Sequence, residues 1–134
     1  YTQLCENNIS KASEIYGALI TLKKLKRSGV NMFISSATPT RTLQRIITMR
    51  GWQGFFEEIM GAPEKKEDHL NYILSLTNYS VTEIVYVGDS EVDQKASLSL
   101  GCKFIGIGEN WSRFSIKPKV LLSDLEKLIQ ELKL

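Results

Sequence analysis

The sequence predicts an α/β domain in which helices cover both faces of a doubly wound parallel sheet. Three observations support this prediction: helix-like and strand-like segments alternate, the strand-like segments are continuous apolar runs, and 134 residues suffice for one domain with a hydrophobic core. Continuous apolar runs are typical of parallel strands that are buried on both faces. We therefore expect a single Rossmann-like core with three α/β/α layers over residues 1–134.

The helix and strand signals follow one another in a regular order. Ser10 is a good N-cap, Gly29 is a helix stop, and Thr38 followed by Pro39 marks a second helix start. The expected helices cover about 10–28, 38–49, 64–76, 90–100 and 123 onward, and the expected strands cover 30–35, 57–60, 83–87 and 103–107. A capping box of Ser123 and Glu126 predicts the start of the last helix.

Composition narrows the class of protein. Hydrophobic residues make up 43% and charged residues 24% of the chain, as in an ordinary globular domain, and the net charge is +2. We expect no nucleic-acid partner, because the densest basic cluster, Lys23 to Arg27, falls at a helix end where cations are favourable. We also expect no membrane partner, since no apolar run approaches about 20 residues. Cys5 and Cys102 are expected to be reduced thiols in the cytoplasm.

Polar side chains follow three of the predicted strands, at the point where each strand ends. They are pairs of hydroxyls, ammonium groups and carboxylates: Ser35 and Ser36, Lys65 and Lys66, and Asp89 and Asp93. Because the carboxyl ends of parallel strands meet at one edge of a sheet, these groups are expected to gather there. Paired carboxylates suit Mg²⁺, and hydroxyl and ammonium groups suit a phosphate ester. The sequence thus predicts a phosphoryl-transfer site that uses Mg²⁺.

Each motif also has a purely structural interpretation. Ser36 and Thr38 are good helix caps, and the charged run EKKED is typical of a solvated helix start. Asp89 is in a sequence that caps a strand-to-helix turn, and Asp93 is favourable in the first turn of a helix. His69, the single histidine, falls where a helix-surface residue is expected, and no role is assigned to it.

Taken in order, the segments MFISSATP, GAPEKK and GDSEVDQKAS resemble the motifs of the haloacid dehalogenase-like hydrolase superfamily, a group of Mg²⁺-dependent phosphatases and relatives. The resemblance covers about Ile15 to Leu134. The first segment is similar to the family's second motif, which implies that Ser36 and Ala37 bind phosphate. The second segment is similar to the third motif, which implies a catalytic lysine at Lys66, or at Lys65 as the alternative. Lys66 and Ser36 would together hold the phosphoryl group that is transferred.

The third segment, with the glycine that follows it at Gly101, is similar to the family's fourth motif. The resemblance implies that Asp89 binds Mg²⁺ directly and that Asp93 is a second acid, bound to the metal directly or through water. In the family this pair works with an aspartate nucleophile that becomes an aspartyl-phosphate.

The chain departs from the family at the first motif. That motif is Asp-x-Asp-x-Thr after an N-terminal strand, and these 134 residues contain no Asp-x-Asp. The nearest imitation, Asp124 with Glu126, is better explained as a helix cap. The predicted core is therefore incomplete at its N-terminus, without its first strand and cap. We expect open edges on the strands ending at Ser35 and Asp89, which would have flanked the absent strand.

The function that the resemblance implies is that of a Mg²⁺-dependent phosphatase acting on a small phosphorylated substrate. It implies an active longer protein and an inactive 134-residue chain, because the nucleophile is not encoded here. The alternatives are a non-catalytic binding or regulatory domain of the same fold, and a dehalogenase or phosphomutase relative. An open sheet also allows a homodimer.

Overall fold

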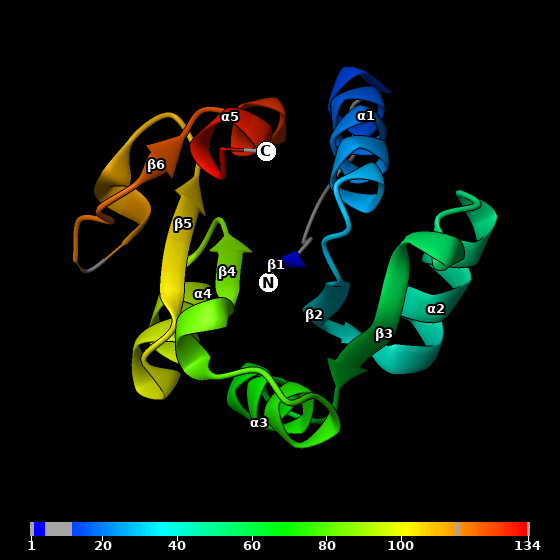
Figure 1. Cartoon of the computed structure of the whole chain (residues 1–134), viewed down its shortest axis with the longest axis horizontal. Coiled ribbons are helices and arrows are strands. Elements are labelled where there is room, and N and C mark those ends of the chain that lie inside the picture. The colour runs from blue at the N-terminus through cyan, green and yellow to red at the C-terminus, as the bar shows by residue number, and fades with distance from the viewer. Residues whose placement is uncertain (1, 5–11, 115, 134) are drawn as a thin grey trace.

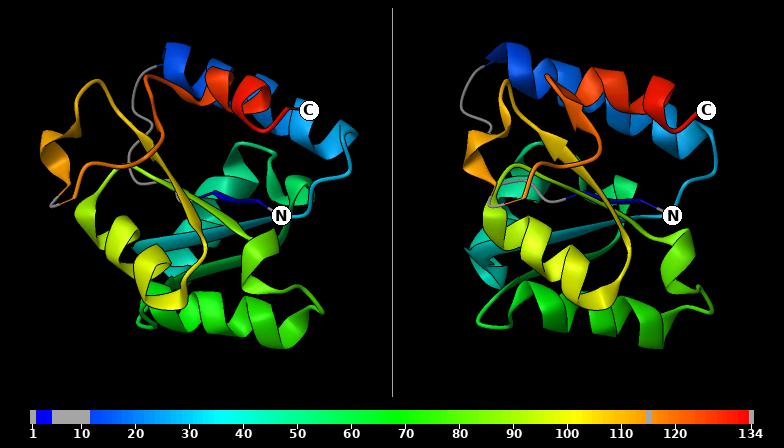
Figure 2. Two further views of the ribbon diagram at one scale, coloured as in Figure 1. Left: turned by 60° about the vertical axis from the view of Figure 1, so that its left-hand side comes forward. Right: turned by 90° about the vertical axis from the view of Figure 1, so that its left-hand side faces the viewer.

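The computed structural model of the chain describes residues 2–4, 12–114 and 116–133. One parallel sheet runs through the molecule, with helices on both sides of it (Figures 1 and 2). The strands are β1 (Thr2–Leu4), β2 (Met32–Pro39), β3 (Phe56–Ala62), β4 (Val85–Gly88), β5 (Lys103–Ile107) and β6 (Leu121–Leu122). The α-helices are α1 (Ala12–Arg27), α2 (Thr40–Met49), α3 (Lys66–Leu76), α4 (Glu91–Leu100) and α5 (Leu128–Glu131). The described residues also include four 3₁₀ turns: η1 (Gln53–Phe55), η2 (Val81–Glu83), η3 (Trp111–Arg113) and η4 (Leu125–Lys127).

The strand order confirms the predicted fold class. The strands lie in the order β3-β2-β1-β4-β5-β6, and every neighbouring pair is parallel. This order, which reverses at β1, is that of the doubly wound Rossmann fold, and such sheets bind ligands beyond the carboxyl ends of their strands. The edge that ends in Ser36 and Asp89 is therefore the edge where a site is expected.

Successive side chains of the central strands point to opposite faces and build two hydrophobic cores. Met32 and Ile34 of β2 pack against α1, α2 and α5 on one face, whereas Phe33 packs against α3 and α4 on the other. Figure 2 shows these layers, with α1 and α5 on one side of the sheet and α3 and α4 on the other. Trp52 and Phe56 are buried in the first core.

A short strand, β1, lies in the centre of the sheet between β2 and β4 (Figure 1). Thr2 and Leu4 are in register with Met32 and Ile34 of β2, and with Val85 and Val87 of β4. The expectation that β2 and β4 have open inner edges is therefore wrong for this structure. It failed because three residues near the N-terminus carry no strand signal of their own, and their backbone pairs on both sides.

The start of α2 differs from the prediction. Thr38 was expected to cap a helix beginning at Pro39, but β2 continues to Pro39 and α2 begins at Thr40. Pairing with β3 explains the difference, because Pro39 is in register with Ala62 and the Thr40 hydroxyl contacts β3. The helix end at Met49 agrees with the expectation.

The C-terminal segment also differs from the prediction. It contains the two-residue strand β6 and the turn η4 before α5 begins. Asp124, rather than Ser123, caps this segment, since its Oδ1 accepts a hydrogen bond from the backbone N–H of Lys127 at 3.3 Å. The cap interpretation of Asp124 is thus the one that the geometry supports.

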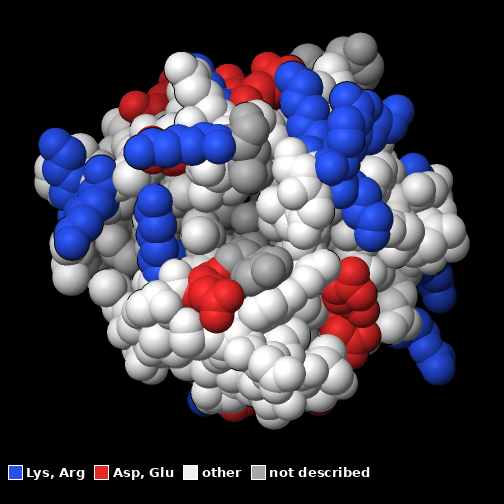
Figure 3. Space-filling model, in the orientation of Figure 1, with Lys and Arg blue, Asp and Glu red and all other residues white. Residues whose placement is uncertain are grey.

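Among the residues that the structure describes, no helix is long and apolar enough to cross a membrane. Basic side chains gather over α1 and at the opposite margin of the face in Figure 3. Lys24, Lys26 and Arg27, in the last turn of α1, are exposed, as expected for a solvated helix end.

Candidate active site

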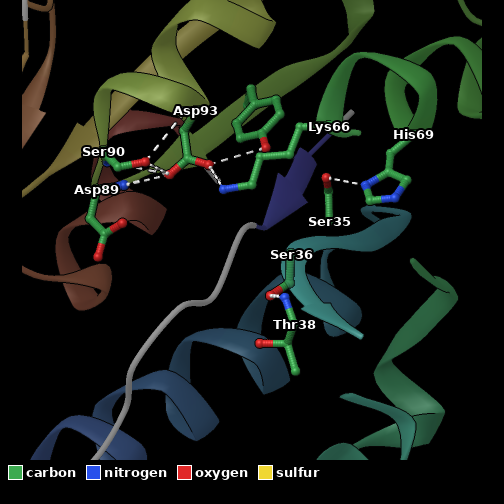
Figure 4. A network of polar contacts seen from close by, with 9 residues as sticks. Ser35, Ser36, Thr38, Lys66, His69, Asp89, Ser90 and Asp93 are labelled. Carbon is green, nitrogen blue, oxygen red and sulfur yellow. Dashed lines mark hydrogen bonds and ion pairs between the residues drawn. The ribbon is translucent and has the colours of Figure 1, made fainter. Parts of the chain in front are cut away.

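Three strand ends bring the predicted polar residues to one edge of the sheet. Ser36 lies near the end of β2, Lys66 begins α3 after β3, and Asp93 lies in the first turn of α4 after β4. Figure 4 shows Lys66 reaching from α3 to Asp93 across the end of the sheet. The structure therefore brings the lysine and the second aspartate together, although 27 positions separate them in sequence.

Asp93 is fully buried and is the centre of the polar network. Its Oδ1 accepts hydrogen bonds from Lys66 Nζ and, at 3.3 Å, from the hydroxyl of Tyr86. Its Oδ2 accepts from the backbone N–H of Asp89 at 3.1 Å, the backbone N–H of Ser90 at 3.3 Å and the Ser90 hydroxyl at 3.0 Å. A buried carboxylate needs such partners, because an uncompensated charge in the interior is strongly destabilising.

The geometry distinguishes Lys66 from Lys65, the two lysines that the spacing of the third motif leaves open. Lys66 is 6% exposed and forms an ion pair with Asp93. Lys65 is exposed, and its backbone N–H donates to Asp68 Oδ2 at 3.2 Å at the start of α3. Of the two lysines left open by the spacing, Lys66 is the one that lies in the network.

Gly88 permits the close approach of Asp93 to β4. A Cβ atom at this position would lie 2.4 Å from Asp93 Cβ and 2.5 Å from Asp93 Oδ2. Such distances do not occur between real side chains, so a residue larger than glycine at position 88 would collide with Asp93. Gly88 is in register with Gly106 of β5, where Phe114 and Pro118 pack.

The two predicted metal ligands do not converge on one point in this structure. Figure 4 shows the carboxylate of Asp89 turned away from the carboxylate of Asp93, whose oxygens face Lys66 and Ser90. Asp89 is partly exposed, whereas Asp93 is fully buried. Among the described residues, no group of three or more His, Cys, Asp or Glu side chains forms a metal cluster.

Asp89 fits Mg²⁺ as one carboxylate ligand, since this ion takes one or two carboxylates and completes its shell with water and phosphate. Asp93 fits better as a residue that holds Lys66 and the turn that carries Asp89.

Ser36 and Ala37 lie in the last part of β2, where the register with β3 shifts between Ser35 and Pro39. The Ser36 side chain is 1% exposed, and its Oγ accepts a hydrogen bond from the backbone N–H of Thr38 at 3.1 Å. Ala37 is exposed. The Ser36 hydroxyl retains its O–H as a donor, so this part of β2 offers that group next to the exposed residue Ala37.

His69 is the residue that sequence reasoning missed. It was expected on a helix surface, but it is 3% exposed and contacts Ser35 and Gly61. A signal was available in the helix period, because Lys66, His69, Leu70 and Ile73 recur at three- and four-residue spacing and are the buried face of α3.

Cys102 does not have the properties of a nucleophile. It is a free, buried cysteine, and burial raises the pKa of its thiol while its hydrogen bonds to Ser97 and to the backbone act in the opposite direction. A raised pKa keeps the thiol protonated, whereas a reactive cysteine requires the thiolate.

Comparison with known proteins agrees with this arrangement of motifs. A family model described as haloacid dehalogenase-like hydrolase matches residues 1–107. The chain belongs to this family. Its sequence is 30% identical over 122 residues to a phosphoglycolate phosphatase of Pseudomonas fluorescens, and 28% identical over 103 residues to one of Vibrio vulnificus. These matches cover 84% and 72% of this chain but 45% of each relative, so the chain spans about half the length of the curated relatives it matches.

Two solved structures described as predicted phosphatases have the same fold. A structure described as a predicted phosphoglycolate phosphatase from Haemophilus somnus superposes with a TM-score of 0.76 at 26% identity, covering 87% of this chain and 56% of that one. A structure described as a predicted phosphatase from Clostridium acetobutylicum has a TM-score of 0.79 at 20% identity, covering 88% of this chain and 59% of that one. The second likeness shows the fold alone.

Proposed function

We propose that this chain supplies the phosphate-binding and metal-binding parts of a Mg²⁺-dependent phosphatase that hydrolyses small phosphate monoesters. The observation that carries the proposal is the buried ion pair between Lys66 and Asp93, which joins the third and fourth motifs of the family. Ser36 lies at the end of a further strand at the same edge. Positioning and charge stabilisation carry most of the catalysis of phosphoryl transfer, and this set of groups supplies both.

Each residue has a separate role in the proposed site. The Ser36 hydroxyl donates to a phosphate oxygen, with the backbone N–H of Ala37 beside it, and Lys66 neutralises phosphate charge. Asp93 holds the Lys66 ammonium group in place, and its contacts with Asp89 and Ser90 fix the turn that carries Asp89. Asp89 would hold Mg²⁺, which when bound supplies positive charge to a phosphate oxygen.

The proposed reaction proceeds through an aspartyl-phosphate, so it needs a nucleophile that these 134 residues do not encode. We place that aspartate, in an Asp-x-Asp-x-Thr motif, in a longer form of the protein. The coverage of 45% of the phosphoglycolate phosphatases supports this placement. The 134-residue chain by itself is then inactive.

The names of the relatives suggest where to look for a substrate. Phosphoglycolate is the first compound to test, and it belongs to the proposed class of small phosphorylated substrates. Nucleic acid and membranes are not proposed partners, and a homodimer remains a proposal without a described interface. The buried free thiol of Cys102 is compatible with the proposed cytoplasmic location, where thiols stay reduced.

Hydrolysis of p-nitrophenyl phosphate and of phosphoglycolate, measured with and without Mg²⁺, tests the proposal. The 134-residue chain should show no turnover, and a longer protein with an intact first motif should be active. In the longer protein, Lys66→Ala should lower kcat/KM by at least about 100-fold, as for removal of one transition-state contact, whereas Lys65→Ala should change it little. Turnover by the short chain would contradict its proposed inactivity. A folded but inert longer protein would instead support a non-catalytic domain.

A further inference from the structure

A buried histidine connects the two phosphate-binding segments of the proposed site. His69 lies on α3, one helical turn after Lys66, and is 3% exposed. Its Nδ1 lies 2.7 Å from the hydroxyl of Ser35, the neighbour of Ser36 on β2. Its Nε2 lies 2.9 Å from the carbonyl oxygen of Gly61 on β3. Figure 4 shows the ring of His69 facing Ser35, beside the Lys66 side chain.

The partners of His69 fix the direction of both hydrogen bonds. The Gly61 carbonyl can only accept, so Nε2 carries the hydrogen and donates it. In the neutral ring Nδ1 is then the acceptor, and the fully buried Ser35 hydroxyl donates to it. Both ring nitrogens are used, and a buried hydroxyl and a buried carbonyl are satisfied by the same side chain.

The same Gly61 is held from its other side by α2. Its backbone N–H donates to Thr40 Oγ1 at 3.0 Å, and the Thr40 hydroxyl donates to the carbonyl of Ala62 at 3.3 Å. The two backbones are also in close contact, because a Cβ on Gly61 would lie 2.2 Å from the carbonyl oxygen of Thr38. A continuous series of hydrogen bonds therefore runs from Ser35 through His69 and Gly61 to Thr40.

This series connects the elements that carry the phosphate-binding groups. Ser35 precedes Ser36, Thr40 begins α2, and His69 lies three positions after Lys66. We propose that His69 is a positioning residue for the proposed active site, which fixes the part of β2 that carries Ser36 relative to Lys66 by binding Ser35 and Gly61 together. The proposal rests on the proposed function, because it gives His69 its role through the phosphate that Ser36 and Lys66 would bind.

The polarity of His69 supports this role over simple packing. Its buried neighbours on α3, Leu70 and Ile73, fill the core with apolar side chains. A leucine at position 69 would also fill space, but it would leave the Ser35 hydroxyl and the Gly61 carbonyl without these partners. Leaving a buried polar group unsatisfied is unfavourable, so the local backbone would shift. A displacement of about 1 Å at a catalytic group can lower a rate about 100-fold.

Three substitutions separate the two bonds of His69. His69→Leu removes both at similar volume, His69→Gln can keep a donor for the Gly61 carbonyl, and His69→Asn can keep an acceptor for Ser35. Asn71→Leu, at an exposed position on the same helix, is the matched control. The variants are made in the longer form of the protein that the proposed function requires. The readouts are competitive inhibition by inorganic phosphate, kcat and KM for p-nitrophenyl phosphate, and the unfolding temperature.

His69→Leu should weaken phosphate inhibition by about tenfold or more, and His69→Gln and His69→Asn should each restore part of the loss. Ser35→Ala should weaken phosphate binding in the wild-type background and have little further effect in the His69→Leu background, because both changes break the same bond. Unchanged phosphate affinity in folded His69→Leu, or in His69→Gln if the leucine variant does not fold, would overturn the proposal. So would fully additive effects with Ser35→Ala. A wild-type protein that neither binds nor hydrolyses phosphate esters would instead overturn the proposed function, and this proposal with it.

Discussion

At the scale of single residues, the site depends on a charge pair that is almost completely removed from water. Lys66 is 6% exposed and Asp93 is fully buried, so each charge relies on the other and on the remaining donors to Asp93. Removal of one member of such a pair leaves an uncompensated charge in the interior, which is more harmful than replacement of both.

Lys66→Met should therefore destabilise the chain by about 3 kcal/mol, the lower end of the range for a broken buried pair, since Tyr86, Ser90 and backbone N–H groups still bind Asp93. Urea unfolding of the variant measures this change as a lower midpoint at an unchanged slope. Lys65→Met is the matched control and should change the free energy of unfolding by less than about 0.5 kcal/mol. Equal effects of the two substitutions would contradict the burial of Lys66.

Gly88→Ala should displace Asp93, because the added methyl group would lie 2.4 Å from Asp93 Cβ. We expect a loss of about 1–3 kcal/mol, typical of overpacking, together with weaker Mg²⁺ binding at the neighbouring Asp89. Thermal unfolding and a Mg²⁺ titration measure the two effects. Gly54→Ala serves as the control, since a Cβ there meets nothing within 4 Å. A Gly88→Ala protein as stable as this control would show that Asp93 is not packed on Gly88.

Residues of the candidate site could be selected from the sequence where a motif fixes their spacing. Lys66 and Asp93 were found this way, and the structure brings them together. The role of Asp93 as an acceptor for Lys66 and Tyr86 was not predictable from one sequence, because the three side chains meet only after β4, α3 and α4 pack together. His69 was missed because it directly follows the charged run EKKED, which is typical of a solvated helix start.

At the scale of elements, the strength of the local sequence signal determined which helix and strand boundaries could be predicted. β5 occurs at the predicted residues 103–107, between two glycines that mark its ends. β3 extends from Phe56 to Ala62, well beyond the predicted 57–60, because its exposed or partly exposed glutamates conceal the strand pattern. β6 has two residues and was not predicted, since its two leucines gain strand structure only by pairing with β5.

The strand β1 depends on pairing with a neighbour on each side. It has three residues, whereas β2 has eight, yet it pairs with strands on both sides. Gln3→Pro removes a backbone N–H from the middle of this strand, which a central strand does not tolerate. The amides of residues 32–34 and 85–87 should then exchange with solvent at least about tenfold faster, which corresponds to about 1.4 kcal/mol of opening free energy.

Hydrogen exchange followed by mass spectrometry measures this effect at the level of peptides. Gln3→Ala keeps the N–H and is the control, so it should exchange like the wild type. If the proline variant shows wild-type protection in both segments, β1 does not hold β2 and β4 together in solution.

At the scale of the whole molecule, the sheet order determines which distant residues meet. The reversal of strand order at β1 places the ends of β2 and β4 on either side of one central strand, and the site residues follow those ends. The alternation of helices and strands made this topology predictable, because parallel strands with crossover helices form few arrangements. The central strand β1 was not predictable, since a strand of three residues has no periodic signal.

The proposed Mg²⁺ site tests whether the 134 residues can hold the metal without the first motif. Asp89 offers one carboxylate, while Asp93 is bound to Lys66 and to the turn at Ser90. A single carboxylate with water binds Mg²⁺ weakly, because the ion is reluctant to lose its hydration shell. We therefore expect the 134-residue chain to bind Mg²⁺ at least about tenfold more weakly than a longer protein with the first motif, a difference of about 1.4 kcal/mol or more.

Isothermal titration of Mg²⁺ into both proteins measures this difference. Asp89→Asn should abolish the residual binding of the short chain, because it removes the carboxylate charge. Asp124→Asn is the matched control: it removes a carboxylate at the C-terminal cap and leaves a good capping residue, so both Mg²⁺ affinity and stability should stay close to wild type. Equal Mg²⁺ affinity in the short and long proteins would contradict the expectation, because Asp89 and its surroundings would then suffice to hold the metal.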